Sequence, residues 1–278
     1  MGYCDRNIIN LQARRHPIER TQHWQSPEQY CLYLMHLRAY HEAGALARDL
    51  TVLDVGCNNG WGSQILAETA RKVLGVDVSL NALSAAPRTD CQRLSFCLVD
   101  GQTLPFKDCS FDLVTAFQII EHIPETLTFT EELKRVLRRE GVALITTPNA
   151  TLRLDPAMKP WNPFHVREYS HEELKNVLAA TFSQVTIKGL FAEQELYEIE
   201  YQRVSAARLR ARQNRRLMMP APSDLRKMGI DLVKSAFPSS LVNVLRRFVN
   251  KFHLPHPVVS QEPRPLEIEA RLSLNDVY

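Results

Sequence analysis

The 278-residue sequence contains no long hydrophobic run. The longest charge-free stretch of its basic C-terminal part, Ser235–Leu245, is far shorter than the about 20 apolar residues that a membrane-spanning helix needs. The N-terminus also lacks the apolar segment of a signal peptide, because Ile8 and Ile9 are followed at once by polar and basic residues. These absences lead us to expect a cytoplasmic protein that is soluble or peripheral at a membrane.

Cysteine patterns typical of zinc sites or disulfide frameworks are absent as well. The six cysteines include no CxxC pair, and in a chain of this length such a pattern is typical of reduced cytosolic thiols. Charge is nearly balanced, with a net value of +3. Between Leu196 and His256, however, twelve Lys or Arg residues stand against four Asp or Glu residues. A mildly acidic body therefore carries a basic segment near its C-terminus.

The central part of the sequence alternates short apolar runs with helical patterns. This alternation predicts βαβ units around a parallel sheet, and therefore an α/β fold. Gly141 is expected to end a helix at Glu131–Arg138 and to lead into the fifth strand. The five expected strands are Thr51–Val55, Lys72–Val76, Ser95–Val99, Phe111–Phe117 and Gly141–Thr147.

The flanking segments are predicted to be mainly helical. Pro27–Ala47 has helical periodicity, and Ser170–Ala180 opens with a capping-box sequence. Further strands are expected at Gln184–Lys188 and Leu266–Leu272, with helices between them. The predicted domains are an N-terminal helical lid at 1–50, a core at 51–191, a basic helical insertion at 192–262 and a final core strand at 263–278.

The loop after the first expected strand contains Asp54, Gly56, Asn58, Gly60 and Trp61. Small residues in such a loop allow a tight turn and a close approach of the backbone to a ligand. A dinucleotide-binding loop would have glycine at the third and sixth positions of GxGxxG. Here those positions are Asn58 and Trp61, and an indole would crowd a pyrophosphate, which argues against an NAD-binding site.

This loop resembles motif I of the class I S-adenosylmethionine-dependent methyltransferases, with Asn58 in place of the commoner glycine. The resemblance implies a doubly wound, seven-stranded sheet of order 3-2-1-4-5-7-6 whose last strand is antiparallel. It also implies S-adenosyl-L-methionine as the cofactor. Because the family's loop surrounds the methionine and ribose part of the cofactor, Gly56, Asn58 and Gly60 are expected to contact it. Asp54 is expected to orient the loop or to bind the amino group.

Two aspartates follow the second and third expected strands. Asp77, with Val78 beside it, can accept hydrogen bonds from both ribose hydroxyls, a feature that NAD-binding folds share. Asp100 and Gly101 resemble the family's adenine-binding turn, in which the aspartate meets the exocyclic amine. The resemblance further implies that the backbone at Gln118, after the fourth strand, helps to hold the methionine end of the cofactor.

His122 follows the fourth strand, at the edge where ligands of open α/β sheets bind. It is a catalytic candidate, as the general base for a hydroxyl acceptor, or it fixes the loop. Glu121, His122 and Glu125 lie close in sequence, but no second cluster with ligand spacing accompanies them, so we expect no metal.

His165 and Arg167 lie in a stretch that resembles methyltransferases acting on glycans, lipids and secondary metabolites. His165 is the second catalytic candidate. Both residues either contact an acceptor or brace their loop against Glu168 and the helix start at Ser170. The acceptor-side candidates are Arg167, Trp61 and Tyr30, the last within the predicted lid together with His23 and Trp24.

The basic insertion has three open interpretations. It caps the acceptor pocket, forms a homodimer face, or makes peripheral contact with an anionic membrane through 203–252. Its segment Tyr201–Met219 carries six arginines, without the interleaved aromatic residues on which bases would stack. We therefore expect no nucleic-acid partner.

Together, these features predict an enzyme that moves a methyl group from S-adenosyl-L-methionine to a hydroxyl or amine of a small-molecule, glycan or lipid-linked acceptor. Two other classes stay open. One is a non-catalytic, cofactor-binding partner subunit, and the other is an NAD-dependent oxidoreductase.

Overall fold

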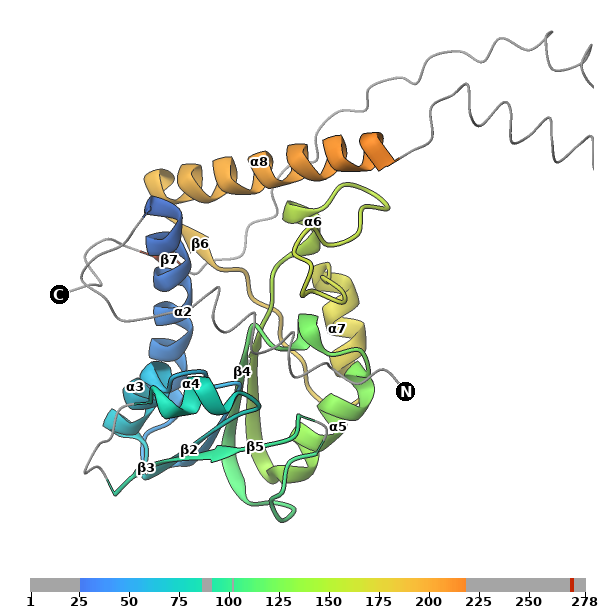
Figure 1. Cartoon of the computed structure of the whole chain (residues 1–278). Coiled ribbons are helices and arrows are strands. Elements are labelled where there is room, and N and C mark those ends of the chain that lie inside the picture. Colours follow the sequence, from blue (N-terminus) through green and yellow to red (C-terminus); the bar gives the residue numbers. More distant parts are fainter. Residues whose placement is uncertain (1–25, 87–91, 102, 219–270, 273–278) are drawn as a thin grey trace, which may run out of the picture. The chain divides into compact units, whose positions relative to one another are not determined.

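The computed structural model describes residues 26–86, 92–101, 103–218 and 271–272 (Figure 1). Contacts within the chain divide it into two compact units, Met1–Arg208 with Glu269–Tyr278, and Leu209–Ile268. Of the second unit, only the end of a long helix belongs to the described residues. The first unit contains the sheet and all of the predicted site residues that the structure describes.

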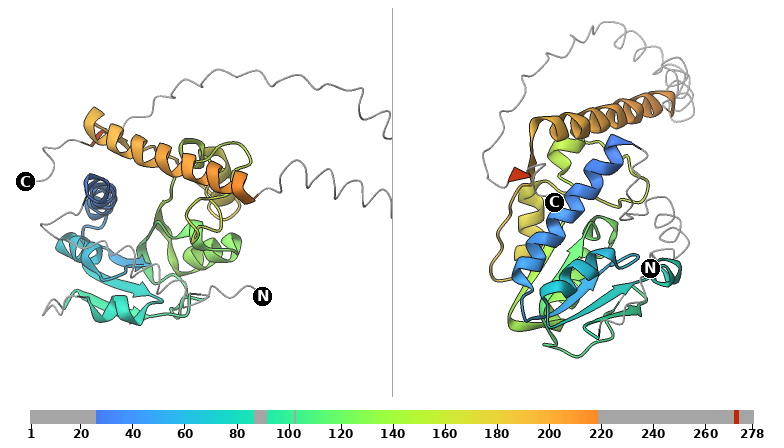
Figure 2. Two further views of the ribbon diagram at one scale, coloured as in Figure 1. Left: turned by 45° about the horizontal axis from the view of Figure 1, so that its top comes forward. Right: turned by 90° about the vertical axis from the view of Figure 1, so that its left-hand side faces the viewer.

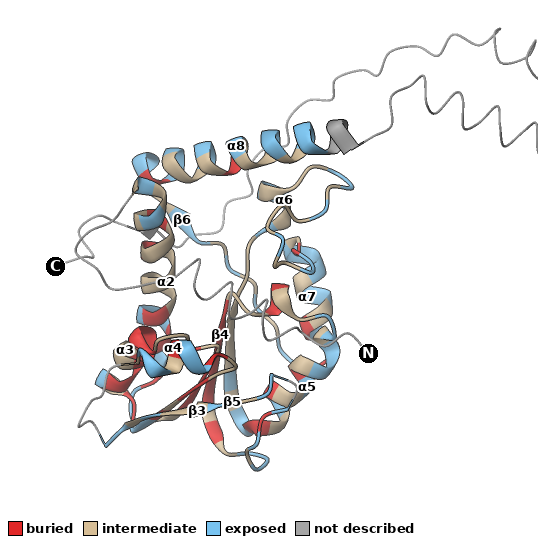
Figure 3. Cartoon of the chain, in the orientation of Figure 1, coloured by how far each residue is buried: buried red, intermediate tan, exposed pale blue. Residues whose placement is uncertain are grey.

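A five-stranded parallel sheet forms the centre of the first unit and confirms the α/β class. Its strand order is β3-β2-β1-β4-β5, and each neighbouring pair runs in parallel. The apolar runs seen in the sequence become strands because both faces of the sheet are covered, and β4 is buried over nearly its whole length (Figure 3). The strands are β1 Thr51–Val55, β2 Lys72–Asp77, β3 Leu94–Leu98, β4 Phe111–Phe117 and β5 Leu137–Thr146.

Two hydrophobic clusters lie on opposite faces of the sheet. Val52 of β1 points into the cluster with helices α2 (Pro27–Leu46) and α3 (Trp61–Thr69). The next residue, Leu53, points into the cluster with α5 (Thr126–Val136) on the other face. This alternation follows from the two-residue period of a strand. The sheet is therefore sandwiched between helices, as expected for a doubly wound fold.

The remaining elements lie mostly at the carboxyl edge of the sheet. Ser170 caps α7 with both hydrogen bonds of a capping box, so the expected helix start is confirmed. Near the start of α2, Cys31 and Leu34 pack against Leu196 of α8 (Figure 2). These elements are α4 Leu80–Ser84, η1 Ile120–His122, α6 Ala150–Arg153, α7 His171–Ala179, β6 Phe191–Ala192, α8 Gln194–Met218 and β7 Arg271–Leu272.

Two local predictions were wrong. Gly141 does not end a helix but lies inside β5, where the pairing with β4 shifts register between Phe111 and Leu113. The expected strand Gln184–Lys188 has no regular secondary structure. Val185 and Ile187 still pack against the cluster around Tyr169, so their alternation reflects side-chain burial without a neighbouring strand.

The end of the predicted sheet order is not confirmed. In the described residues, β6 and β7 form a separate two-stranded sheet and pair in parallel. The seven-strand order and the antiparallel last strand therefore stay predictions. His23, Trp24, the segment 219–262 of the basic insertion and most of the predicted last strand lie outside the described residues. Among the helices that the structure describes, none has the length and apolar character needed to cross a membrane.

Candidate active site

The residues predicted to bind the cofactor meet at the carboxyl edge of the sheet. Gly56, after β1, donates its backbone N–H to the carbonyl of Val76 in β2 at 2.8 Å. The loops after β1, β2, β3 and β4 thus converge at the edge where open α/β sheets bind ligands.

The glycine loop owes its course to backbone conformations that glycine favours. Gly56 and Gly60 have φ values of 74° and 76°, and Asn58, at 50°, is also in the left-handed region. A Cβ on Gly60 would lie 2.3 Å from the ring of Phe96. The glycine requirement there is therefore set by packing against β3 as well as by φ.

Asp77 ties the end of β2 to the glycine loop. Its Oδ2 accepts a hydrogen bond from the backbone N–H of Asn58 at 2.8 Å, and its Oδ1 accepts one from Ser79 at 2.8 Å. Burial raises the pKa of the Asp77 carboxyl, while these backbone donors act to lower it. A carboxylate has further lone pairs beyond these two bonds, which is what recognition of two vicinal hydroxyls requires.

Asp54 is a buried residue that links several elements of the fold through hydrogen bonds. Its carboxylate is fully buried and accepts hydrogen bonds from Ser63 Oγ at 2.6 Å, from Thr115 Oγ1 at 2.7 Å and from the hydroxyl of Tyr40 at 3.3 Å. Burial raises the pKa of Asp54 to about 6 although these three hydroxyls donate to it. The side chain thus connects β1 with α2, α3 and β4, which fits the loop-orienting role and not direct contact with the amino group.

The loops after β2 and β3 pack together at the expected adenine-binding turn. Gly101 has a φ of 79°, and a Cβ there would lie 2.8 Å from Val78 Cγ1. Asp100 is exposed, and its Oδ1 accepts a hydrogen bond from the N–H of Thr103 at 3.1 Å. The carboxylate of Asp100 is therefore held at the rim of the site.

Gln118 turns the chain sharply after β4. Its φ is 56°, and its backbone N–H donates to the carbonyl of Thr146 at 2.9 Å. Its side-chain Nε2 donates to Thr146 Oγ1 at 3.3 Å. Gln118 thus joins the ends of β4 and β5 beside the other loops of the site.

Two acceptor-side candidates lie in packed surroundings. Trp61 is only 8% exposed, and its ring lies 5.4 Å from those of Tyr33 and Tyr40. Tyr30 is partly buried in the cluster where α2 packs against α8.

His122 is brought next to His165. Its Nδ1 lies 2.8 Å from the carbonyl oxygen of Phe164, and the two imidazole rings meet edge to face at a centroid distance of 4.8 Å. Burial lowers the pKa of His122 to about 4. His122 is consequently a neutral imidazole at pH 7, with one lone pair for a proton or a cation.

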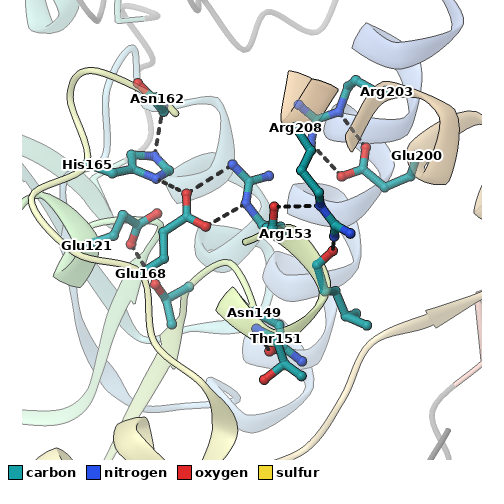
Figure 4. A network of polar contacts seen from close by, with 12 residues as sticks. Glu121, Asn149, Thr151, Arg153, Asn162, His165, Glu168, Glu200, Arg203 and Arg208 are labelled. Carbon is teal, nitrogen blue, oxygen red and sulfur yellow. Dashed lines mark hydrogen bonds and ion pairs between the residues drawn. The ribbon is translucent and has the colours of Figure 1, made fainter. Parts of the chain in front are cut away.

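His165 is held by a buried polar network (Figure 4). Its Nδ1 lies 2.7 Å from Oε1 of Glu168, and its Nε2 lies 2.8 Å from Nδ2 of Asn162. Arg153 binds both oxygens of Glu168, at 2.9 and 3.1 Å. Although burial acts to raise it, the hydrogen bonds from His165 and Arg153 hold the pKa of Glu168 below its usual range.

Glu121 completes this polar cluster from the loop after β4. It is 1% exposed, and its Oε2 accepts a hydrogen bond from Thr147 Oγ1 at 3.0 Å. Burial raises the pKa of Glu121 to about 7 despite this bond. One ligand atom each of Glu121, His122 and His165 lies within 4.8 Å of the other two. His165, which comes from a different loop, is therefore the potential metal-binding neighbour of Glu121 and His122 that sequence spacing did not reveal.

Arg167 braces the start of α7. Its Nη2 donates to Oε1 of Glu173 at 2.9 Å, and its guanidinium lies over the ring of Tyr169 at 5.2 Å. Farther along, Arg208 of α8 donates to the carbonyl oxygens of Leu152 and Arg153 at the end of α6. The first part of α8 is thus attached to the loop that carries Arg153.

Comparison with known proteins decides the family. A family model described as a methyltransferase domain matches residues 53–145, which contain the loops after β1, β2, β3 and β4. Residues 53–145 are a methyltransferase domain. This match agrees with the resemblance seen in motif I.

Relatives of this methyltransferase domain match part of the chain. A Mycobacterium tuberculosis protein named "Probable S-adenosylmethionine-dependent methyltransferase" is 37% identical over 155 residues, 55% of this chain and 56% of that protein. The chain thus spans little more than half the length of this relative. The ubiquinone biosynthesis O-methyltransferase of Haemophilus ducreyi is 30% identical over 110 residues, 37% of this chain and 47% of that enzyme.

A solved structure shows the same fold. It is a methyltransferase from the complex with the Haloferax volcanii Trm112 methyltransferase activator, with a TM-score of 0.50 and 22% identity. The match covers 58% of this chain and 74% of that one.

Several residues that shape this candidate site were not found from the sequence. Tyr40 and Thr115 hold Asp54 from a helix and a strand remote in sequence, and Arg153 reaches Glu168 from α6. No periodicity marks such pairs, since they meet only when the sheet assembles. Among these missed residues, Asn162 could have been found from the sequence, because it stands three residues before His165 in the stretch that carried the resemblance.

Proposed function

We propose that this chain transfers a methyl group from S-adenosyl-L-methionine to a hydroxyl, or an amine, of a small-molecule, glycan or lipid-linked acceptor. The observation that carries the proposal is the position of Asp77. Its carboxylate accepts a hydrogen bond from the backbone N–H of Asn58. This bond fixes the glycine loop at the edge of the sheet where the family binds its cofactor. Gly56, Gly60, Val78, Asp100, Gly101 and Gln118 complete the proposed cofactor site, with Asp54 beneath it.

The proposed chemistry is a direct displacement in which the acceptor atom attacks the sulfonium methyl group. Since the leaving thioether needs no further activation, alignment of the two reactants is the main task, and proximity alone contributes roughly 7–11 kcal/mol. His122 is the catalytic candidate that the geometry supports, because it is neutral at pH 7 and follows β4 at the cofactor edge. His165 has both ring nitrogens engaged and positions its neighbours in this arrangement.

The proposed acceptor binds on the side of His122. Among the acceptor-side candidates, Trp61 is buried in the aromatic cluster between α2 and α3, and Arg167 is paired with Glu173, so neither carries this assignment. Attachment of α8 to α6 through Arg208 supports a capping role for the first part of the 192–262 insertion. An oxygen acceptor agrees with the name of the Haemophilus ducreyi relative, whose match covers less than half of that enzyme.

Methyl-labelled S-adenosylmethionine, incubated with the full chain and fractionated cell extracts, tests the proposal. We expect label to appear in one fraction among polar metabolites, glycans and lipids, and to be lost in the Asp77→Ala variant. Binding of the cofactor without label transfer to any fraction would favour the non-catalytic subunit instead.

A further inference from the structure

Three side chains that commonly bind metals meet beside the end of β4. Glu121 and His122 come from η1, and His165 comes from the loop before α7. One ligand atom of each lies within 4.8 Å of the other two. A carboxylate and two imidazoles form one of the ligand sets that bind catalytic zinc.

The carboxylate of Glu121 supplies an independent observation. Its Oε1 is buried and has no hydrogen-bond partner, while Thr147 occupies only Oε2. Within the part of the chain that the structure describes, no Lys or Arg lies at ion-pair distance from Glu121. Buried polar atoms are usually satisfied, so an unpaired oxygen here calls for a proton or a cation.

Both imidazoles are held as metal-binding histidines usually are. The carbonyl of Phe164 faces Nδ1 of His122, and the carboxylate of Glu168 faces Nδ1 of His165. Each Nδ1 therefore carries the proton, and each Nε2 carries the lone pair. Metal-ligating histidines are typically fixed by this kind of carbonyl or carboxylate acceptor.

Asn162 competes with a cation for one of these nitrogens. Its Oδ1 accepts the N–H of Phe164 at 3.0 Å, which orients the amide so that Nδ2 donates to Nε2 of His165 at 2.8 Å. A cation bound to His165 replaces this hydrogen bond. Removal of the Asn162 amide should consequently favour cation binding.

We propose that Glu121, His122 and His165 bind one divalent transition-metal cation such as Zn²⁺. Two imidazole ligands favour this class over Mg²⁺ or Ca²⁺, which prefer sites made of oxygen alone. Three protein ligands leave a further coordination position, as in catalytic zinc sites. Cation binding at these residues does not depend on the proposed methyl transfer.

Cobalt titration of the full, metal-stripped chain tests the site, because Co²⁺ reports its ligands in its absorption spectrum. The wild type should bind one Co²⁺ with visible bands of a nitrogen and oxygen ligand set, and Zn²⁺ should displace it. A thiolate-to-cobalt charge-transfer band would overturn the proposal, since the cysteines would then be the ligands. No saturable binding would overturn it as well.

Four variants locate the site. Glu121→Gln and His165→Gln should each weaken Co²⁺ binding at least about tenfold, whereas Asn162→Ala should leave it equal or tighter. The control His171→Gln changes an exposed histidine beside Glu172 and should have no effect. Unchanged affinity in both ligand variants, or weaker binding in Asn162→Ala, would contradict the assignment.

Circular dichroism checks that each preparation is folded, and calorimetry with S-adenosylmethionine checks that it binds the cofactor. These two measurements distinguish loss of the cation site from loss of the fold or of the cofactor site. A variant that loses Co²⁺ but stays folded and binds the cofactor supports the cation site alone. If a ligand variant does not fold, the wild-type cobalt spectrum and the Asn162→Ala titration still decide the proposal. Loss of cofactor binding in the wild type would count against the proposed function and not against the cation site.

Discussion

The backbone N–H of Asn58 donates to the Asp77 carboxylate at 2.8 Å, which joins the glycine loop to the end of β2. Asn58 occupies a position where glycine is commoner in the family, and it adopts the left-handed conformation that such a glycine would supply. Asn tolerates this conformation better than most residues. The substitution therefore preserves both the turn and its contact with Asp77.

Replacing Asp77 tests this contact in cofactor binding. In Asp77→Asn one acceptor oxygen becomes a donor, and hydrogen bonds to a charged group are worth about 1.5–3 kcal/mol. We expect calorimetry to show affinity for S-adenosylmethionine about 10- to 100-fold lower. Asp108→Asn is the matched control, because Asp108 is exposed and pairs with Arg135 away from the site. Equal affinities of Asp77→Asn and wild type would contradict the assigned role.

Gly60→Ala tests the shape of the loop. The left-handed φ and the Cβ position 2.3 Å from Phe96 should lower the free energy of unfolding by about 1–3 kcal/mol. Gly44→Ala, in the last turn of α2, would meet no atom closer than 4.0 Å. It should raise stability by about 0.5–1 kcal/mol. Urea denaturation of both variants checks the pair, and a stable Gly60→Ala protein would refute the packing argument.

Asp54 makes stability depend on pH in a definite direction. Its pKa is about 6 in the folded chain, against about 3.9 when unfolded. The folded state therefore binds more protons between these values, and its stability falls as pH rises from about 4 to 6, by at most about 3 kcal/mol. Asp54→Asn should remove this component. We expect the stability difference, wild type minus variant, to decrease across this range in urea titrations, and a constant difference would contradict the buried-carboxyl account.

Breaking the Arg153–Glu168 pair should be costly. Glu168 is fully buried and Arg153 nearly so, and removing one partner of a buried pair costs about 3–5 kcal/mol. We expect a loss of this size in Arg153→Met by urea denaturation, and partial recovery when Glu168→Gln is added. Arg71→Met, which breaks an exposed pair with Asp112 at 3.4 Å, should change stability by less than about 1 kcal/mol. Similar losses in the two single variants would show that burial does not set the cost.

The sequence predicted those features that depend on local pattern. Apolar runs located β1 to β5, and the capping box at Ser170 located the start of α7, because burial on both faces and a helix cap leave direct signatures. The prediction that Gly141 ends a helix was wrong, because a glycine that ends a helix and one inside an irregular strand look alike in sequence.

The cluster of Glu121 with His165 had no such signature. The two residues lie on different loops, and their proximity depends on the contacts of the Val166 and Arg167 N–H groups with the carbonyl of Glu121. Side chains that meet across the top of a sheet cannot be paired from spacing alone. The same holds for Tyr40 and Asp54, which meet only after α2 packs on the sheet.

Calorimetric titration of the full chain with S-adenosylmethionine and S-adenosylhomocysteine tests the central claim most directly. The account predicts saturable binding of both compounds at one site per chain, with no heat from NADH under the same conditions. Folded protein that gives no heat with either sulfur compound would contradict the assignment of the loops after β1, β2 and β3 as the cofactor site.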